Sequence, residues 1–403
     1  ERADWCISRQ RYFGVPFPVW YCRECGKPVL AEERELPINP AEASYHGVCC
    51  CGCREFVPET AVFDTWATSS LTPLLNARIG EKGQRDYLLP MSMRTQAHEI
   101  IRTWAFYTIV KSLYHTGRLP WRDIMICGFV LAKKGEKISK SKGNGGISPK
   151  DLVQKYSADA LRYWAANARL GTDTFFAEDE LSASLRFLTK LWNASRFAVS
   201  RLEGISLTAP CVLLPVDRWI IEQTNAAIQK TSDYMNRYEI GLARHVIDDL
   251  FWKDFCDQYI EIVKERLYQP DIHGKEGTQS AQFALYYSLY NILKLYAPFV
   301  PHITEYIYQQ FFRQYEKAES LHQTVWEKPK PYDPTLILFG EKLKLAVSEM
   351  RKWKTENGLS LGAPIDCMTI TAPKEFMGWF QQSELDLKAC ARADEIRFQI
   401  EEF

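Results

Sequence analysis

The stretch Gly128-Phe-Val-Leu-Ala-Lys-Lys-Gly-Glu-Lys137-Ile138-Ser139-Lys140-Ser141-Lys142-Gly143-Asn144 decides how this chain is interpreted. Its apolar run ends at Leu131 and predicts a buried strand, and the loop after it is crowded with Lys, Ser and Gly. Ammonium groups, hydroxyls and the exposed backbone N–H groups of glycine together suit phosphate binding. Ser148-Pro149 then predicts an N-cap and a helix over about 149–170. A solvated basic loop is the alternative interpretation.

Length and composition set the outer limits. At 403 residues the chain is long enough for two or three domains, each with its own core. Lys plus Arg and Asp plus Glu number 50 each, so a nucleic-acid surface would be a local patch. The absence of a long apolar run or a signal peptide predicts no membrane span. The 12 Cys, scattered or grouped as metal-binding pairs, are typical of a reducing, cytoplasmic setting.

Two groups of Cys predict a metal site. Cys22-Arg-Glu-Cys25 is a Cys-x-x-Cys pair, and the second group is the run Cys49-Cys50-Cys51-Gly52-Cys53. Two such pairs make a tetrahedral Zn²⁺ site, and its role is structural because four thiolates leave no open position. We predict Cys22, Cys25, Cys50 and Cys53 as ligands from their spacing, with Cys51 as the substitute. Free thiols are the alternative.

The remaining pattern divides the chain by secondary structure. Alternating helices and short apolar strands before the Lys loop predict a parallel sheet with a ligand at the carboxyl ends of its strands. A helix is expected to open at Met93-Arg-Thr-Gln-Ala-His-Glu. From Leu181 the pattern is wholly helical, with further helices expected near 216–236, 240–267 and 277–297. The tail predicts a helix ending near Lys354, a strand at about 368–371, another helix and a final strand.

The helix that begins near Leu181 has two different faces. One face is apolar and is expected to be buried: Leu181, Leu185, Leu188, Trp192, Ser195, Val199 and Leu202. The opposite face carries Arg186, Lys190, Asn193 and Phe197, and an aromatic ring among polar and cationic side chains suits stacking on an unpaired RNA base. A solvated face with one exposed Phe is an equal alternative.

Lys137-Ile-Ser-Lys-Ser141 resembles the Lys-Met-Ser-Lys-Ser signature of class I aminoacyl-tRNA synthetases, with Ile138 in place of Met. Asp64-Thr-Trp-Ala-Thr-Ser-Ser70 and Pro298-Phe-Val-Pro301 are similar to segments of the valyl, isoleucyl and leucyl branch. The resemblance implies an α/β fold: a partial Rossmann-type nucleotide fold with a zinc knuckle, then an all-α bundle and a small α/β domain. We expect a catalytic part at 1–180 with a zinc-binding insertion at about 20–60. An anticodon-binding domain at 181–334 and a C-terminal domain at 335–403 follow.

The resemblance also implies roles for individual residues. Lys137 and Lys140 would stabilise charge on the departing phosphates of ATP, bound with Mg²⁺, while Ser139 and Ser141 hold the loop. Five residues are expected to bind the substrate. Trp66 and Trp104 would form walls of the amino-acid pocket. Ala97 and Glu99 stand where the family has Gly-x-Asp, and Gly128 is the fifth. A core tryptophan is the alternative for Trp66.

The seven His residues do not form the His-x-Gly-His motif of class I enzymes, and the branch's editing domain has no counterpart here. We therefore expect a C-terminal part of a longer enzyme. The segments at 64–70 and 100–107 and the cysteine pairs most resemble those of archaeal-type valyl enzymes, which implies activation of valine with ATP and transfer to tRNA(Val). By itself the chain is expected to be a monomer that binds tRNA but is catalytically incomplete. The alternatives are isoleucine as the amino acid, a tRNA-binding module without chemistry, and a structural remnant whose loop binds any polyanion.

Overall fold

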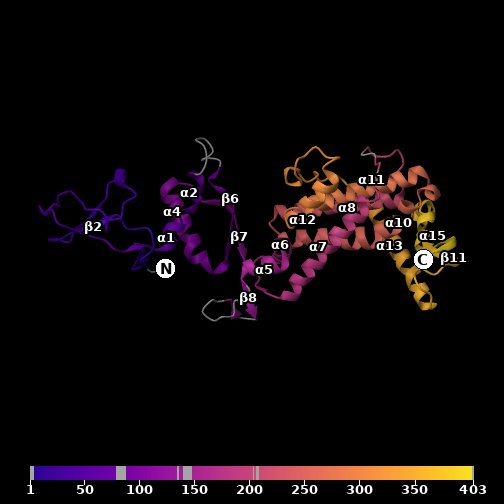
Figure 1. Cartoon of the computed structure of the whole chain (residues 1–403), viewed down its shortest axis with the longest axis horizontal. Helices are drawn as coiled ribbons and strands as arrows, with labels where there is room; N and C mark the ends of the chain where they lie inside the picture. The colour runs from indigo at the N-terminus through magenta and orange to yellow at the C-terminus, as the bar shows by residue number, and fades with distance from the viewer. Residues whose placement is uncertain are drawn as a thin grey trace. The chain divides into compact units, whose positions relative to one another are not determined.

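The computed structural model describes residues 4–78, 88–133, 136–138, 148–202, 204–205 and 208–401. The chain divides into two compact units, Glu1–Gly128 and Phe129–Phe403 (Figure 1). Ser139, Lys140 and Ser141 lie outside the described residues, and only the backbone of Lys137 is described. The predicted phosphate contacts of this loop therefore stay a prediction.

The first unit begins with small antiparallel sheets. Strands β2 (Val19–Cys22), β3 (Pro28–Leu30) and β4 (Phe56–Pro58) pair in the order β3-β2-β4. Strand β1 (Ser8–Arg9) pairs antiparallel with β5 (Val62–Phe63). Strands this short bury little apolar surface, and the buried side chains beside Phe56 are Cys22, Cys49 and Cys53. Three cysteine side chains thus form this small core.

The rest of the first unit is built around two parallel strands. Helices α1 (Thr65–Ser69) and α2 (Thr72–Arg78) precede β6 (Met91–Ala97), which pairs in parallel with β7 (Trp121–Cys127). Between the strands run 3₁₀ and π-helical turns over 98–105 and helix α4 (Phe106–Thr116).

The prediction of a helix opening at Met93 is therefore wrong, because Met91–Ala97 pairs with β7 and the helical turns begin at His98. Pairing with a strand about thirty residues away overrode the local helical pattern.

The second unit opens with a small sheet and two short helices. Strand β8 (Val130–Lys133) lies between β10 (Thr174–Phe175), which is parallel to it, and β9 (Glu136–Lys137). The helix predicted over 149–170 is two helices, α5 (Pro149–Tyr156) and α6 (Ala158–Ala165).

Ser157 separates these two helices. Its φ is 73°, which ends α5, and its Oγ accepts a hydrogen bond from Ala160 N at 3.3 Å, which starts α6. The predicted N-cap of α5 is confirmed, since Ser148 Oγ accepts a hydrogen bond from Asp151 N.

A helical bundle forms most of the second unit. Its helices are α7 (Glu178–Val199), α8 (Pro215–Asn236), α9 (Ile240–Asp248), α10 (Ile260–Tyr268), α11 (Pro270–Tyr296) and α12 (Pro301–Ile307). A π-helical stretch over 249–259 joins α9 to α10. Large aromatic side chains such as Trp219, Phe251 and Tyr296 are completely buried between the helices. The helices predicted near 216–236, 240–267 and 277–297 are confirmed.

The elements of the tail follow in the order predicted from the sequence, with two short helices between the strands where one was expected. Helix α13 (Pro334–Glu356) is followed by β11 (Ile365–Ala372), α14 (Met377–Gln382), α15 (Glu384–Ala391) and β12 (Ala393–Ile400). The two strands form a parallel pair. The mixed α/β class with many helices is confirmed. Over the described ranges no helix combines the length and apolarity needed to cross a membrane.

Candidate functional site

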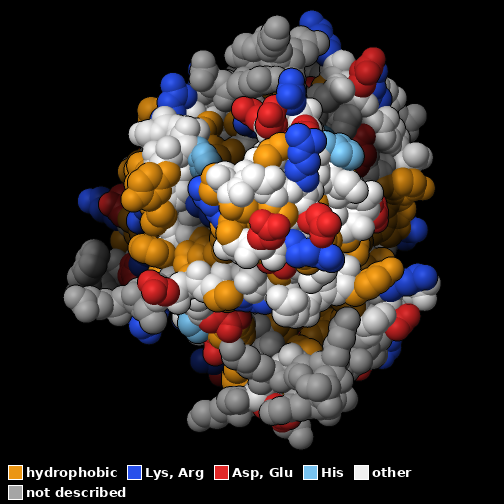
Figure 2. Space-filling view, turned by 90° about the vertical axis from the view of Figure 1, so that its left-hand side faces the viewer, with side chains coloured by type: hydrophobic (Ala, Val, Ile, Leu, Met, Phe, Trp, Pro, Cys, Tyr) orange, Lys and Arg blue, Asp and Glu red, His pale blue; other side chains and the backbone are white. Residues whose placement is uncertain are grey.

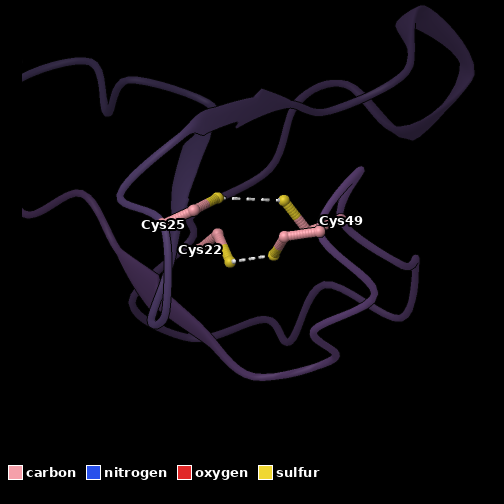
Figure 3. A group of neighbouring side chains, drawn as sticks. Cys22, Cys25 and Cys49 are labelled. Atoms are coloured by element: carbon pink, nitrogen blue, oxygen red, sulfur yellow. Dashed lines mark hydrogen bonds between the residues drawn. The ribbon is translucent and has the colours of Figure 1, made fainter.

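The clearest chemical site is a group of four cysteines in the first unit. The Sγ atoms of Cys22, Cys25, Cys49 and Cys51 lie within 4.8 Å of one another. Cys22 Sγ is 3.5 Å from Cys51 Sγ, and Cys25 Sγ is 3.5 Å from Cys49 Sγ. Figure 3 shows Cys25 and Cys49 facing each other, with Cys22 beside them. Four thiolates at Zn–S distances of about 2.3 Å in a tetrahedron have sulfurs roughly 3.8 Å apart. The group can hold a metal ion of this kind.

Two tight turns bring these thiols together. In the first, Cys22 N donates to Lys27 O and Gly26 N donates to Cys22 O, both at 2.9 Å. In the second, Cys49 N donates to Cys53 O and Gly52 N donates to Cys49 O, at 2.9 and 2.8 Å. The two glycines have φ of 68° and 90°, which other residues rarely adopt. Each turn therefore holds two of the four thiols: Cys22 and Cys25 in the first turn, and Cys49 and Cys51 in the second.

The two other thiols predicted as ligands have different neighbours. Cys50 Sγ lies 3.4 Å from Lys27 Nζ, and Cys53 Sγ accepts a hydrogen bond from Glu55 N at 3.3 Å. The structure therefore gathers Cys49 and Cys51 where the spacing argument placed Cys50 and Cys53. The second turn is one residue shorter than a Cys-x-x-Cys knuckle, so spacing alone favours a different pair from the one that the turn brings together. Both Cys25 and Cys51 are followed directly by glycine, and this Cys-Gly sequence could have pointed to Cys51.

The thiols differ in acidity. Backbone hydrogen bonding from Cys25 lowers the pKa of Cys22 to about 6, so this residue is a thiolate at neutral pH. At Cys49 the Cys51 backbone N–H favours the thiolate, but burial and the neighbouring thiols outweigh it and raise the pKa to about 12. Four thiols this close do not all ionise without a cation, so metal binding would release protons.

The predicted substrate-binding residues of the first unit lie at one edge of the parallel pair. Ala97 ends β6, lies opposite Cys127 in the strand register, and is followed by the turn containing Glu99. Gly128 directly follows β7. Parallel strands end at the same edge, so Ala97, Glu99 and Gly128 are brought to it together.

The two predicted pocket tryptophans lie on neighbouring segments but differ in exposure. Trp66 is 40% exposed on α1, and Trp104 is 6% exposed. Trp104 donates its Nε1–H to Ser69 Oγ at 3.0 Å, while Arg94 lies over its ring at 3.9 Å and Trp121 stacks at 5.8 Å. Trp66 therefore has indole surface open to a ligand, and the rings and guanidinium around Trp104 make it a packing residue.

The predicted tRNA-binding face of α7 is only partly exposed. Arg186 and Asn193 are exposed, whereas Lys190 and Phe197 are half-buried. Lys190 Nζ lies 3.7 Å from Asp257 Oδ1 and over the Trp252 ring at 5.4 Å. The predicted buried face is partly rotated from its expected position: Leu181, Ser195 and Leu202 are buried, but Leu185, Leu188, Trp192 and Val199 are half-buried. Phe187 and Leu191 are buried in the core instead, because other helices contact the side of α7 on which they lie.

Two residues that the sequence did not single out extend this face. Arg201 lies over the Tyr268 ring at 3.8 Å, and Phe197 packs beside Tyr268 with ring centroids 6.1 Å apart. Arg201 is one helical turn beyond Phe197, which could have suggested it, but Tyr268 is on another helix. On the face of the molecule shown in Figure 2, basic, acidic and hydrophobic side chains are interspersed, in keeping with the balanced charge.

Two protein-family models match parts of the chain. Residues 1–177 match the model of class I tRNA synthetases of the I, L, M and V group, and residues 217–369 match the anticodon-binding domain of tRNA ligase. The chain belongs to the class I aminoacyl-tRNA synthetases.

Its curated relatives are valine–tRNA ligases. The chain is 41% identical to that of Anaplasma marginale over 91% of its length and 44% of the relative's. It is 40% identical to that of a Wolbachia endosymbiont of Brugia malayi over 98% of its length and 47% of the relative's. It is 41% identical to that of Haloarcula marismortui over 90% and 40%. The chain thus spans about half the length of the curated relatives it matches.

A solved structure supports the fold. The ternary complex of Agrobacterium radiobacter K84 agnB2 LeuRS, tRNA and LeuAMS matches with a TM-score of 0.63 and 21% identity. The match covers 83% of this chain and 42% of that one. At this identity the likeness concerns the arrangement of the backbone alone.

Proposed function

We propose that this chain is part of a valine–tRNA ligase, which activates valine with ATP and transfers it to tRNA(Val). The observation that carries the proposal is about 40% identity to valine–tRNA ligases over nearly the whole chain. The proposed division has a partial Rossmann-type catalytic part at 1–180, an anticodon-binding domain at 181–334 and a small domain at 335–403. The two matched family models support the first two parts.

In the proposed reaction the valine carboxylate attacks the α-phosphate of ATP, and pyrophosphate leaves. Lys137 and Lys140 would stabilise the charge that develops on the departing phosphates, with Mg²⁺ supplied together with ATP. Ser139 and Ser141 would order the loop. Ala97, Glu99 and Gly128, at the carboxyl edge of the parallel pair, would bind the nucleotide and amino acid, with the exposed indole of Trp66 as an apolar wall.

The proposed metal is a structural Zn²⁺ held by Cys22, Cys25, Cys49 and Cys51. The mutual distances of the four sulfurs support this set. The ion would replace the apolar core that the short strands around it cannot provide.

For tRNA, we propose the surface of α7 and its extension, with Arg186 and Asn193 exposed and the rings of Phe197 and Tyr268 beside Arg201. A guanidinium over an aromatic ring can bind both a phosphate and a stacked base. The position of Tyr268 within the segment matched by the anticodon-binding model supports this choice.

Binding of the chain to valine and isoleucine tRNA transcripts, measured across a salt series, tests the proposal. We expect tighter binding of the valine transcript, and loss of the preference when its anticodon is changed. A preference for the isoleucine transcript would overturn the choice of amino acid. Equal and steeply salt-dependent binding to both would overturn anticodon recognition by this part of the chain.

A further inference from the structure

Besides the α7 surface proposed for tRNA, a second group of basic side chains lies where the helical bundle meets the tail. A partly open cavity of about 650 Å³ lies where α10, α13 and α15 meet, helices that lie side by side in Figure 1. It has contributions from all three helices and from the turn at 361–362. No residue predicted from the sequence for any function lines it.

The cavity is lined by more cations than anions. Four cationic side chains (Lys264, Arg351, Lys354 and Arg392) and two carboxylates (Glu261 and Glu265) line it. The carboxylates have partners of their own: Lys264 Nζ lies 3.5 Å from Glu261, and His273 Nε2 lies 3.4 Å from Glu265. Among the described residues, no carboxylate forms an ion pair with Arg351, Lys354 or Arg392. In the described part of the chain, these three cations thus share one cavity with Glu261 and Glu265 but are not ion-paired with either carboxylate.

Lys354 fixes one side of the cavity. Its side chain is buried, and Nζ donates to Leu361 O at 3.1 Å and to Ala363 O at 2.6 Å. These bonds hold the turn after α13 and place a positive charge at the cavity wall. Burial and the charge of Arg392 lower the pKa of Lys354, so these two cations repel each other. A bound anion would relieve this repulsion.

Arg392 occupies a backbone position that disfavours it. It is the residue after α15, with φ 52° and ψ 43°, a left-handed conformation in which glycine is the usual residue. Glycine there would be the more stable choice, so the guanidinium is retained at a conformational cost. Strained residues of this kind are frequent in ligand clamps.

We propose that this cavity binds a phosphate group of an RNA strand, through Arg351 and Arg392 with the adjacent charge of Lys354. The inference rests on the proposed function and deepens it, since it makes the tail of the chain a second contact for tRNA. Tyr268, the ring beside Arg201 on the bundle, also lines this cavity, so one strand can reach both sites. A free nucleotide offers the same phosphate chemistry as RNA, and the experiment separates the two sources.

The test compares two variants with a matched control in tRNA binding across a salt series. Arg392→Gly removes the guanidinium at a position that glycine fits, so the fold is retained, and Arg351→Gln removes the second cation. Lys352→Gln is the control: it removes one charge from the neighbouring position of α13, where Lys352 pairs with Glu356 and does not line this cavity. We expect each cavity variant to bind the valine transcript about tenfold more weakly at physiological salt. The slope of log K against log salt should fall in magnitude by roughly one.

Binding by the Arg392→Gly and Arg351→Gln variants that equals the Lys352→Gln control would overturn the proposal. A second arm titrates the wild-type chain with AMP by calorimetry. Saturable AMP binding that the cavity variants abolish, with tRNA binding unchanged, would assign the cavity to a free nucleotide instead of RNA. If the wild-type chain binds no tRNA, the proposed function fails by itself. The RNA contact then fails with it, and AMP binding reports on the cavity separately.

Discussion

At the scale of single residues, the cysteine group shows how one backbone conformation selects ligands. Glycine after Cys25 and after Cys51 permits the turns that direct each pair of thiols inward. The intervening Cys50 faces Lys27. Spacing favoured Cys50 and Cys53, but the turn brings Cys49 and Cys51 to the group.

The zinc ligand set gives the first prediction. Cys51→Ser should lower zinc affinity at least tenfold, because three thiolates and a hydroxyl hold the ion less well. Cys50→Ser should leave affinity unchanged. Zinc content after dialysis against a competing chelator measures both. Loss of zinc in Cys50→Ser with retention in Cys51→Ser would favour the pair Cys50 and Cys53 instead.

A buried ionic triad links the bundle to the tail. Arg266 Nη1 lies 2.7 Å from Asp217 Oδ2, and Arg266 Nε lies 2.8 Å from Asp386 Oδ1, with all three side chains buried. Tyr259 Oη donates to Asp217 Oδ1 at 2.7 Å. One guanidinium is thus shared by two carboxylates, and burial, with the charge of Asp217, raises the pKa of Asp386 to about 6.

The triad gives a prediction for pH. The folded-state pKa of Asp386 lies above its unfolded value of about 3.9, so the folded chain binds the proton more tightly. The contribution of this group to the free energy of unfolding therefore falls as pH rises from about 4 to 6, by about 3 kcal/mol at most. In urea unfolding at several pH values, the free energy of unfolding should decrease less over this pH range in Asp386→Asn than in the wild type. Glu384→Gln, at a half-buried position two residues away, is the control, and equal pH profiles for wild type and Asp386→Asn would contradict the prediction.

At the scale of elements, helices α8 and α13 meet without space for a side chain. A Cβ built on Gly340 of α13 would lie 1.9 Å from Trp219 Nε1 of α8, and Trp219 is completely buried. The glycine allows the two helix backbones to approach closely. This contact joins the tail to the bundle independently of the ionic triad.

Gly340→Ala should therefore destabilise the second unit, by about 1–3 kcal/mol, since the tryptophan must move within a packed core. Gly378→Ala is the matched control: this glycine lies in helix α14 with open space at its Cβ, so alanine should be neutral or slightly stabilising. Urea unfolding followed by far-UV circular dichroism measures both. A Gly340→Ala chain as stable as the Gly378→Ala control would contradict the prediction.

At the scale of the whole molecule, the two compact units depend on different forces. The second has a large apolar core that runs from Tyr163 to Ile396. The first unit has small clusters of buried side chains, one at the cysteines and one at Trp104 and Trp121. The proposed zinc therefore contributes most where apolar burial is least.

Metal removal should act on one unit alone. After chelation, amide hydrogen exchange should increase in the strands and turns of 19–58, while the bundle helices α8 and α11 keep their protection. Hydrogen exchange with mass spectrometry resolves the two regions, and restoring Zn²⁺ should reverse the change. Increased exchange in the bundle helices would contradict the independence of the two cores.

The sequence by itself determined the family, the helical bundle, the order of elements in the tail and the presence of a thiolate group. These follow from motifs and periodicities that are local in the chain. Tertiary structure decided the rest: β6 is a strand because β7 pairs with it, and Ser157 divides a helix that looked continuous. It decided which cysteines meet, and it joined Arg351 to Arg392 around a cavity. Such contacts join residues far apart in sequence, and their energies depend on distances that no local pattern contains.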